Sequence, residues 1–594
     1  MVSDIFHALV AMQRMYLSNL REDSVDWRER VFVRQNQILR GRLLTLPLLL
    51  IVVLVTASCS PRQTSRFHWD PPEFRVKGTY YFQPKAAINN FWSWLDWEQS
   101  KTDFAQLRED GFNTIILFIP WGLFQPTVRP ITYNEQAFAE LDQLLQLADS
   151  FGLKGVLRVG THDHIPRDAH GGKWLAGTVL ASDEEWAAYR DLFRELATRT
   201  KSHPNLLFLF WTFEDTGYFP DLWLHQYPEN VAVFRQWLRR RPLGEWNKLW
   251  GEKNVSYETV EPPNQNREPM NPRKLRSFLD FSDELLARRL PDACAAAKQG
   301  NPNVILSFQP RAEINFGHDF SLQFELPSCY SFVTTWFSPY QSYLFGDRRT
   351  NLDGKTTASY VPRYVERTEK LSKGLPVFFD QFNFQHFGGT AGEGALQTAK
   401  EQLDFIAGSL PVLLRDSLGY ALWNYSDYYL NVVSDGAFRF GLQEWEAPSQ
   451  QGLVAMLSSP DHKRSEVEIR PGGFVRQNIT GNPIAEYTLE FQARSTSADT
   501  RVHIQLHYQP TEQFMDFSVP VSSQEKLFTL KVKIPRESNS VAMMFSPSEG
   551  GGTVRIKEIM FYPWVDTGGI YDVKGKPRAE LRDVFRKFNN LMPD

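Results

Sequence analysis

The chain has 594 residues, which exceeds one ordinary domain, so two folded units with additional segments are expected. Its net charge of −4 and pI near 6.4 provide no basic surface of the kind that neutralises phosphates, so nucleic acid is not expected as a partner. Cysteine occurs only at positions 59, 294 and 329, which excludes a disulfide-dense scaffold and any cysteine-rich metal site.

An apolar run, LLTLPLLLIVVLVTAS, covers residues 43–58 and lies between two arginines, Arg40 and Arg42, and Cys59. A basic flank, about 13 apolar residues and small residues before a cysteine are typical of a secretory signal, and the run is shorter than a bilayer span of about 20 residues. The sequence TASC is similar to a bacterial lipobox, which would make Cys59 the lipidated first residue of the mature protein.

We therefore expect a protein of the cell envelope, lipid-anchored in the periplasm or at the outer membrane, or secreted. A plain signal anchor is the alternative. Residues 1–42 are too long for a normal n-region, so they are either a cytoplasmic tail or the result of a start site placed too far upstream. Residues 60–74 contain the proline-rich stretch RFHWDPPEF and are predicted to form a linker.

From residue 75 onward, apolar strand-like runs alternate with helical patterns. The runs are 76–82, 114–119, 155–160, 206–211, 304–308, 330–335, 376–380 and 419–423. Strands that alternate with helices indicate a parallel sheet, and eight such units indicate a closed barrel. The predicted fold class is α/β, a (β/α)8 TIM barrel over residues 75–450.

Two of the intervening helices carry clear end signals. Gly152 is at the position expected for a left-handed C-cap of the helix that follows the second run. Ser182 and Glu185 have the spacing of a capping box at the start of the helix that follows the third run. Nearly a hundred residues, helical and charged, separate the fourth and fifth runs. An insertion on this side of a barrel is expected to form one wall of the cleft.

From about residue 465 the pattern changes to short stretches that alternate apolar and polar residues, among them YTLEFQARS and VRIKEIMFY. They predict an all-β sandwich over residues 460–565, similar to the jelly-roll carbohydrate-binding modules, which either binds sugar or braces the enzyme. Residues 566–594 predict a turn and an amphipathic helix. We expect this helix to close the barrel, with the sandwich inserted before it; a separate helix on the sandwich is the alternative.

Three of the apolar runs end on residues that suit chemistry on a sugar. LLFLFWTFEDTG leads to Glu214, LPVFFDQFNFQH contains Asp380, and GYALWNYSDY contains Trp423. Hydrolysis of a glycosidic bond with retention needs a proton donor and a carboxylate placed about 5 Å from it. Asp215 is an alternative donor, and Asp380 could instead be a structural cap. The 17 tryptophans give mild support to a carbohydrate ligand, because sugar rings pack on aromatic side chains.

The chain resembles the glycoside hydrolases of the retaining (β/α)8 superfamily, most closely the family 42 β-galactosidase type, over roughly residues 75 to 440. The resemblance lies in FRQWLRRRPLGEWNKLWGEKN followed by two prolines, in LPVFFDQF and in GYALWNYSDY. It implies that Glu214, at the end of strand four, is the acid/base and that Asp380, at the end of strand seven, is the nucleophile. Two residues depart from the pattern: Phe213 replaces an asparagine, and Asp380 replaces a glutamate.

Further substrate-binding residues are expected around the same barrel mouth. Trp423, Trp121 and Trp336 are expected to stack on sugar, and Tyr340 to hydrogen-bond the nucleophile as a tyrosine does in related barrels. Arg311 is a candidate positive partner, or part of a surface ion pair.

His162 and His164, at the end of strand three, are expected to hydrogen-bond substrate. A zinc site, for which a further ligand would be needed, and a purely structural role are the alternatives. No cofactor or metal is expected in the leading interpretation.

The sequence therefore favours a retaining glycoside hydrolase that cleaves β-glycosidic bonds of a polysaccharide or oligosaccharide by double displacement. One alternative is a non-catalytic cell-surface glycan-binding lipoprotein on a decayed barrel, which the two departures from the family pattern favour. Another is a metal-dependent barrel hydrolase that uses the His-Asp-His segment. A carbohydrate and, through the N-terminal anchor, a membrane are the expected partners.

Overall fold

The structure is a computed structural model of the chain. It describes residues 74–160, 166, 168–169, 177–212, 228–263, 271–310, 326–337, 353–382, 398–458, 465–480, 486–497, 499–535, 538, 540–563 and 567–591. Within these ranges no helix combines the length and the apolar character needed to cross a bilayer. The predicted export segment, residues 43–59 with Cys59, lies outside the described residues.

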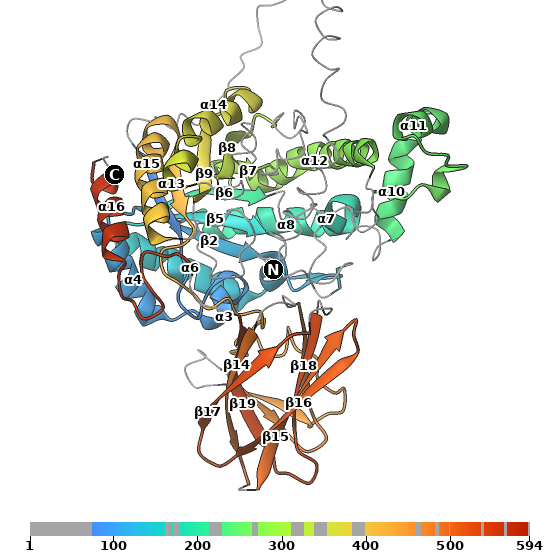
Figure 1. Cartoon of the computed structure of the whole chain (residues 1–594), viewed down its shortest axis with the longest axis vertical. Helices are drawn as coiled ribbons and strands as arrows, with labels where there is room; N and C mark the ends of the chain where they lie inside the picture. The colour runs from blue at the N-terminus through green and yellow to red at the C-terminus, as the bar shows by residue number, and fades with distance from the viewer. Residues whose placement is uncertain are drawn as a thin grey trace, which may run out of the picture. The chain divides into compact units, whose positions relative to one another are not determined.

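Eight parallel strands close into a barrel in which β1 pairs with both β2 and β10. Figure 1 labels β2 and β5 to β9 of this barrel, with helices around them. The strands are β1 (Val76–Tyr80), β2 (Thr114–Pro120), β5 (Lys154–Gly160), β6 (Leu206–Thr212), β7 (Leu306–Gln309), β8 (Tyr330–Phe337), β9 (Val377–Phe382) and β10 (Gly419–Leu422). Each coincides with one of the predicted apolar runs, because a strand covered on both faces has no side that must be polar. The TIM-barrel prediction is confirmed.

Helices surround the barrel, and their ends follow local sequence signals. The longer ones are α4 (Trp97–Glu109), α6 (Glu135–Ser150), α8 (Asp183–Thr200), α12 (Pro272–Gly300), α14 (Val361–Leu371), α15 (Ala399–Asp416) and α16 (Ala579–Asn589). Gly152 follows α6 with a φ of 71°, and the Ser182 side chain accepts a hydrogen bond from the Glu185 backbone N–H at the start of α8. The C-cap at Gly152 and the N-cap half of the predicted capping box are thereby confirmed.

Further helices and two short strands lie in the connections between the barrel strands. They are η1 (Ile88–Asn90), α3 (Phe91–Trp94), α5 (Trp121–Phe124), β3 (Thr127–Val128), β4 (Ile131–Thr132), α7 (Gly177–Ala181), α10 (Pro228–Leu238), α11 (Leu243–Trp250), η3 (Tyr257–Thr259) and α13 (Gly354–Ala358). The insertion between β6 and β7 includes α10 and α11, which contact α7 and α12. Three tryptophans, Trp237, Trp246 and Trp250, stack in a column there, with ring centroids 5.5 and 5.2 Å apart.

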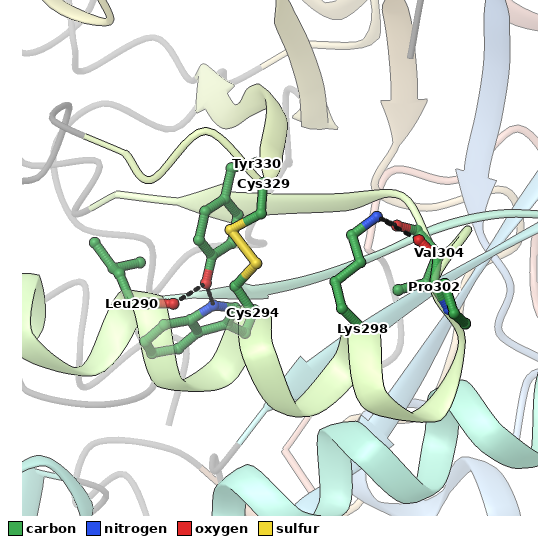
Figure 2. Close-up of a disulfide and its surroundings, with 8 residues drawn as sticks. Leu290, Cys294, Lys298, Pro302, Val304, Cys329 and Tyr330 are labelled. Carbon is green, nitrogen blue, oxygen red and sulfur yellow. Dashed lines mark hydrogen bonds between the residues drawn. A yellow bond between two sulfur atoms is a disulfide. The ribbon is translucent and has the colours of Figure 1, made fainter. Parts of the chain in front are cut away.

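One disulfide, which the sequence analysis did not predict, joins Cys294 in α12 to Cys329 just before β8 (Figure 2). Next to it, the Tyr330 hydroxyl donates a hydrogen bond to the Leu290 carbonyl of the same helix at 2.9 Å and accepts one from the Trp211 indole at 3.1 Å. The disulfide and the tyrosine together fasten the last barrel helix before β7 to the start of β8.

The C-terminal sandwich consists of two antiparallel sheets, with strand orders β11-β12-β19-β14-β17 and β13-β18-β15-β16. Its strands are β11 (Val454–Ser458), β12 (Ser465–Ile469), β13 (Val475–Thr480), β14 (Glu486–Ser495), β15 (Thr500–Gln509), β16 (Gln513–Val521), β17 (Lys526–Lys533), β18 (Ser540–Pro547) and β19 (Val554–Tyr562). From β12 onward the strands are shared between the sheets in the order of a jelly roll. The prediction of an all-β second domain is confirmed.

After the sandwich the chain returns to the barrel and forms α16 there (Figure 1). Asp110, a fully buried residue that follows α4, accepts hydrogen bonds from the hydroxyls of Tyr425 and Tyr571, both at 2.7 Å. It also accepts hydrogen bonds from the guanidinium groups of Arg582, at 2.8 Å, and Arg586, at 2.6 Å. This buried carboxylate holds the last helix against the first βα unit.

Candidate functional site

Four polar side chains form one layer inside the barrel, near the carboxyl ends of its strands. Tyr80, Arg158, Gln309 and Asp380 come from β1, β5, β7 and β9, which are alternate strands around the barrel. Layers of four side chains from alternate strands fill the interior of such barrels, usually with branched apolar residues. A polar layer at this end, where active sites of this fold are found, marks the candidate site.

The Asp380 carboxylate is held by two side chains of this layer. The Gln309 amide nitrogen donates to both carboxylate oxygens at 2.8 Å, and the Tyr80 hydroxyl donates to Oδ2 at 3.2 Å. Arg158 Nη1 in turn donates to the Tyr80 hydroxyl at 3.2 Å, and its guanidinium lies 5.8 Å from the centroid of that ring. A cation is therefore linked to the carboxylate through a phenol.

An irregularity in β9 places Asp380. Along β8, Thr335 and Trp336 are consecutive, but their partners in β9 are Phe379 and Gln381. The pairing of β9 with β10 also shifts in this region. Asp380 is thus an additional residue relative to β8, and bulges of this kind next to active sites redirect a side chain.

Burial keeps the nearby phenols protonated. It raises the pKa of Tyr80 well above its ordinary value; the Arg158 charge opposes the rise, and the Asp380 charge adds to it. Burial also raises the pKa of Tyr364 to about 12, with the hydrogen bond to Thr335 opposing and the Asp380 charge reinforcing the shift. At neutral pH the Tyr80 hydroxyl therefore remains a hydrogen-bond donor to Asp380.

An aromatic wall stands beside the layer. Trp423, the first residue after β10, packs with its ring centroid 4.6 Å from that of Tyr80 and 5.2 Å from that of Phe82. Its indole N–H donates to the Tyr428 hydroxyl at 3.2 Å. Trp423 remains partly exposed, whereas Asp380 and Gln309 are 0 % exposed. The indole can therefore present a surface to a ligand next to the buried carboxylate.

The other two predicted tryptophans differ in exposure. Trp336, near the end of β8, is partly exposed. Trp121 begins α5 and is 1 % exposed; its ring lies 5.0 Å from that of Tyr189 and its N–H donates to Gln125 at 2.6 Å. In this structure Trp121 is a packing residue of the layer between barrel and helices.

Several predicted residues lie outside the described residues, and their roles stay predictions. They are Glu214 with its alternative Asp215, His162 and His164, Arg311, Tyr340 and the lipidation candidate Cys59. The described part of β6 ends at Thr212, whose register partner in β7 is Gln309. In the described ranges no three residues of the His, Cys, Asp and Glu types gather in a way that could hold a metal ion.

Three residues of the layer, Tyr80, Arg158 and Gln309, were not among the predicted site residues. Their signal was present in the sequence: each is polar and stands within or directly after an apolar strand run. Polar side chains at the same inward level of alternate barrel strands meet one another, because the tilt and stagger of the strands group such side chains into layers.

Comparisons with known proteins give limited similarity. No protein-family model matches the chain. Beta-galactosidase 8 of Oryza sativa subsp. japonica is 27% identical over 128 residues, which cover 19% of this chain and 17% of that protein. The match therefore spans under a fifth of the curated relative.

Solved structures that resemble this chain include the β-galactosidases of the psychrophilic Marinomonas ef1 and of Rahnella sp. R3. The first has 14% identity and a TM-score of 0.44, with 59% of this chain and 54% of that chain covered; the second has 16% and 0.45, with 60% and 52% covered. A GH5_18 protein of Streptomyces cattleya, in complex with GlcNAc, has 14% identity and a TM-score of 0.39, with 60% and 72% covered. The chain thus spans about half the length of the two β-galactosidases, and its barrel assignment rests on its own strand pairing.

Proposed function

We propose that the barrel is a retaining glycoside hydrolase that acts on β-glycosidic bonds of an oligosaccharide or polysaccharide, with Asp380 as nucleophile and Glu214 as acid/base. The observation that carries the proposal is the placement of Asp380 at the carboxyl end of a barrel strand, held by Gln309 and Tyr80. A carboxylate whose two oxygens are both held by donors is oriented before substrate arrives, which is what a positioned nucleophile requires.

The proposed reaction has two steps. An Asp380 oxygen attacks the anomeric carbon, the bond to the leaving oxygen breaks, and Glu214 gives its proton to that oxygen. Water then attacks the anomeric carbon of the glycosyl ester; its proton passes to the Glu214 carboxylate, and Asp380 is released as a carboxylate. The described groups contribute orientation: the amide and the phenol fix the attacking carboxylate, and Trp423 offers a partly exposed ring surface for the sugar.

One observation favours the second candidate, a glycan-binding protein that does not cleave its ligand. Asp380 is 0 % exposed in this structure, so substrate must displace neighbouring groups to reach it. Gln381 on β9 and Trp336 on the neighbouring strand β8 are partly exposed, and in this candidate they would contact a bound glycan that is not cleaved. The two candidates differ in whether Asp380 becomes bonded to sugar.

The experiment uses the full chain and aryl β-glycosides of galactose, glucose and mannose. The galactoside is the first to try, because the rice relative is a β-galactosidase. Glu214→Gln and Asp380→Ala are each expected to lower kcat by about a thousandfold or more, since each removes a reacting group. Azide is expected to restore turnover to Asp380→Ala, with formation of a glycosyl azide of inverted configuration.

Asp583→Asn, on the exposed face of α16, is the matched control and is expected to keep wild-type kcat. Labelling of wild-type protein with a 2-deoxy-2-fluoro glycosyl fluoride is expected to place the sugar on the peptide that contains Asp380. Glycan binding without turnover or labelling of any of the three sugars would favour the non-catalytic candidate.

The proposed location is the cell envelope, with the chain held there through lipid on Cys59. The Cys294–Cys329 disulfide supports export, because disulfides persist in oxidising compartments and are rare in reducing ones.

A further inference from the structure

The amide of Gln309 has a fixed orientation. Gln309 ends β7 and is 0 % exposed, and one end of its amide lies 2.8 Å from both oxygens of Asp380. The amide nitrogen donates to both of these oxygens, so the amide oxygen is directed elsewhere. The carboxylate thereby decides which way the amide points.

The amide oxygen is left without a hydrogen-bond donor among the described residues. Tyr80, the nearest phenol of the layer, directs its proton to Asp380 instead. An amide oxygen that is buried without a hydrogen-bond donor destabilises the site, because it has lost its water partners and gained none. The site therefore contains a buried hydrogen-bond acceptor that a ligand hydroxyl would satisfy. This acceptor belongs to the same amide whose nitrogen holds the nucleophile.

We infer that Gln309 is a substrate-positioning residue that bridges the nucleophile and the sugar. Its nitrogen holds Asp380, and its oxygen accepts a hydrogen bond from the hydroxyl on the ring carbon next to the anomeric carbon. That hydroxyl is the sugar group closest to a carboxylate attacking the anomeric carbon, so the amide that touches the carboxylate also reaches it. The inference rests on the proposed glycosidase function and names how the site recognises its substrate.

The test is a cycle of two substrates and two enzymes. Values of kcat/KM are measured for wild type and Gln309→Met on the aryl β-glycoside that wild type turns over fastest, and on its 2-deoxy analogue. Methionine keeps the length of the side chain, but it has no donor to hold Asp380 and its sulfur is only a weak hydrogen-bond acceptor. Because the same two substrates are used with both enzymes, their intrinsic reactivities cancel.

Removal of the 2-hydroxyl from the substrate is expected to lower kcat/KM in both enzymes. The factor of this decrease is expected to be at least about ten times larger in wild type than in Gln309→Met, a coupling of the size expected for two groups in direct contact. Gln505→Met is the matched control: Gln505 lies in β15 of the sandwich, and its amide also donates to a carboxylate, that of Asp516, at 3.1 Å. This variant is expected to show the wild-type penalty for the 2-deoxy substrate.

Equal penalties in wild type and Gln309→Met would overturn the inference while leaving the hydrolase proposal in place; the amide oxygen would then hold water only. Absence of turnover and of labelling in wild type would overturn both. If Gln309→Met does not fold, as judged by its melting temperature, Gln309→Leu decides. It also lacks an acceptor toward the hydroxyl, so the penalty for the 2-deoxy substrate is expected to fall in the same way, and an unchanged penalty would contradict the inference.

Discussion

Buried carboxylates outside the barrel mouth have their own energetic consequences, and Asp103 is the simplest of them. This residue of α4 is 6% exposed and accepts hydrogen bonds from the Tyr81 hydroxyl at 3.0 Å and the Gln99 amide at 2.7 Å. Burial raises its pKa from 3.8 to about 6, although both hydrogen bonds act in the opposite direction. The folded protein therefore binds a proton at Asp103 more tightly than the unfolded chain does.

This shift predicts a pH-dependent difference between wild type and Asp103→Asn. The stability contribution of the raised pKa is fully present below pH 3.8 and is lost as the pH rises through about 6. Asparagine does not titrate, so between about pH 4 and pH 7 the free energy of unfolding should shift in favour of the variant by about 2 kcal/mol. Urea denaturation at the two pH values measures this change. Asp583→Asn should give the same difference at both, and a pH-independent difference for Asp103→Asn would contradict the prediction.

The sequence predicted site residues where carboxylates and tryptophans end a strand, and it missed the groups that hold them. Asp380 and Trp423 stood out because their residue types are associated with sugar chemistry. Gln309 directly follows the run VILSF, but an amide does not titrate, so its residue type alone does not indicate a catalytic role. Arg158 lies inside the run VLRVG. Its partner, the Tyr80 hydroxyl, is more than seventy residues away, and such a contact becomes visible only once the barrel closes.

At the scale of elements, α16 shows how a distant segment completes the barrel. Asp110 is fully buried and accepts hydrogen bonds from Arg582 and Arg586 of this helix, whereas its neighbour Glu109 pairs with the same two arginines from an exposed position. The Glu109 side chain is 64% exposed and that of Asp110 is 0% exposed. Two adjacent carboxylates that share two arginine partners thus differ in burial, and only the buried one also accepts hydrogen bonds from Tyr425 and Tyr571.

Asp110→Ala is expected to lower the free energy of unfolding by about 3 kcal/mol, because it removes the buried partner of two cations and two phenols. Glu109→Ala is its control and should cost less than about 1 kcal/mol, since exposed ion pairs are screened by water. Thermal and urea denaturation of the purified chain measure both. Equal losses for the two variants would show that burial does not decide the strength of this contact.

Prediction of the elements succeeded where the chain is apolar throughout and was weaker where it is short or interrupted. All eight barrel strands were found, but β16 was not. It contains Pro520, which lacks a backbone N–H and therefore weakens the strand pattern. The structure shows β16 at the edge of its sheet, where a proline is tolerated. β11, β12 and β13 were not among the predicted strands either; they have only five or six residues each, too few to show a clear alternation.

At the scale of the whole molecule, the disulfide and the predicted export segment bear on the same question. Cys294 and Cys329 are 35 residues apart in the sequence and are bonded in the structure. A loop of this size, once closed, stabilises a fold by about 4 kcal/mol in the chain-entropy model. This contribution is available only where thiols are oxidised.

We expect the full chain, produced in a bacterium, to carry the oxidised pair and to sediment with membranes. A chain that starts at residue 61 should stay in the cytoplasm with both thiols reduced, and Cys59→Ser should lose the lipid and leave the membrane fraction. Alkylation of free thiols followed by mass spectrometry of the Cys294 and Cys329 peptides measures the redox state. A reduced pair in the full chain would contradict the export proposal.

Because the chain returns to the barrel only after the sandwich, the ribosome synthesises all eight barrel strands well before α16, the helix that completes the barrel's outer layer. Roughly 150 residues separate β10 from α16, so at 5 to 20 residues per second a ribosome needs on the order of 10 to 30 s between them. During that interval the nascent barrel has all its strands but lacks its final covering helix, and the Asp110 carboxylate has no arginine partners from α16. A transcript cut short within the sandwich would therefore yield a protein with an open flank rather than a smaller working enzyme.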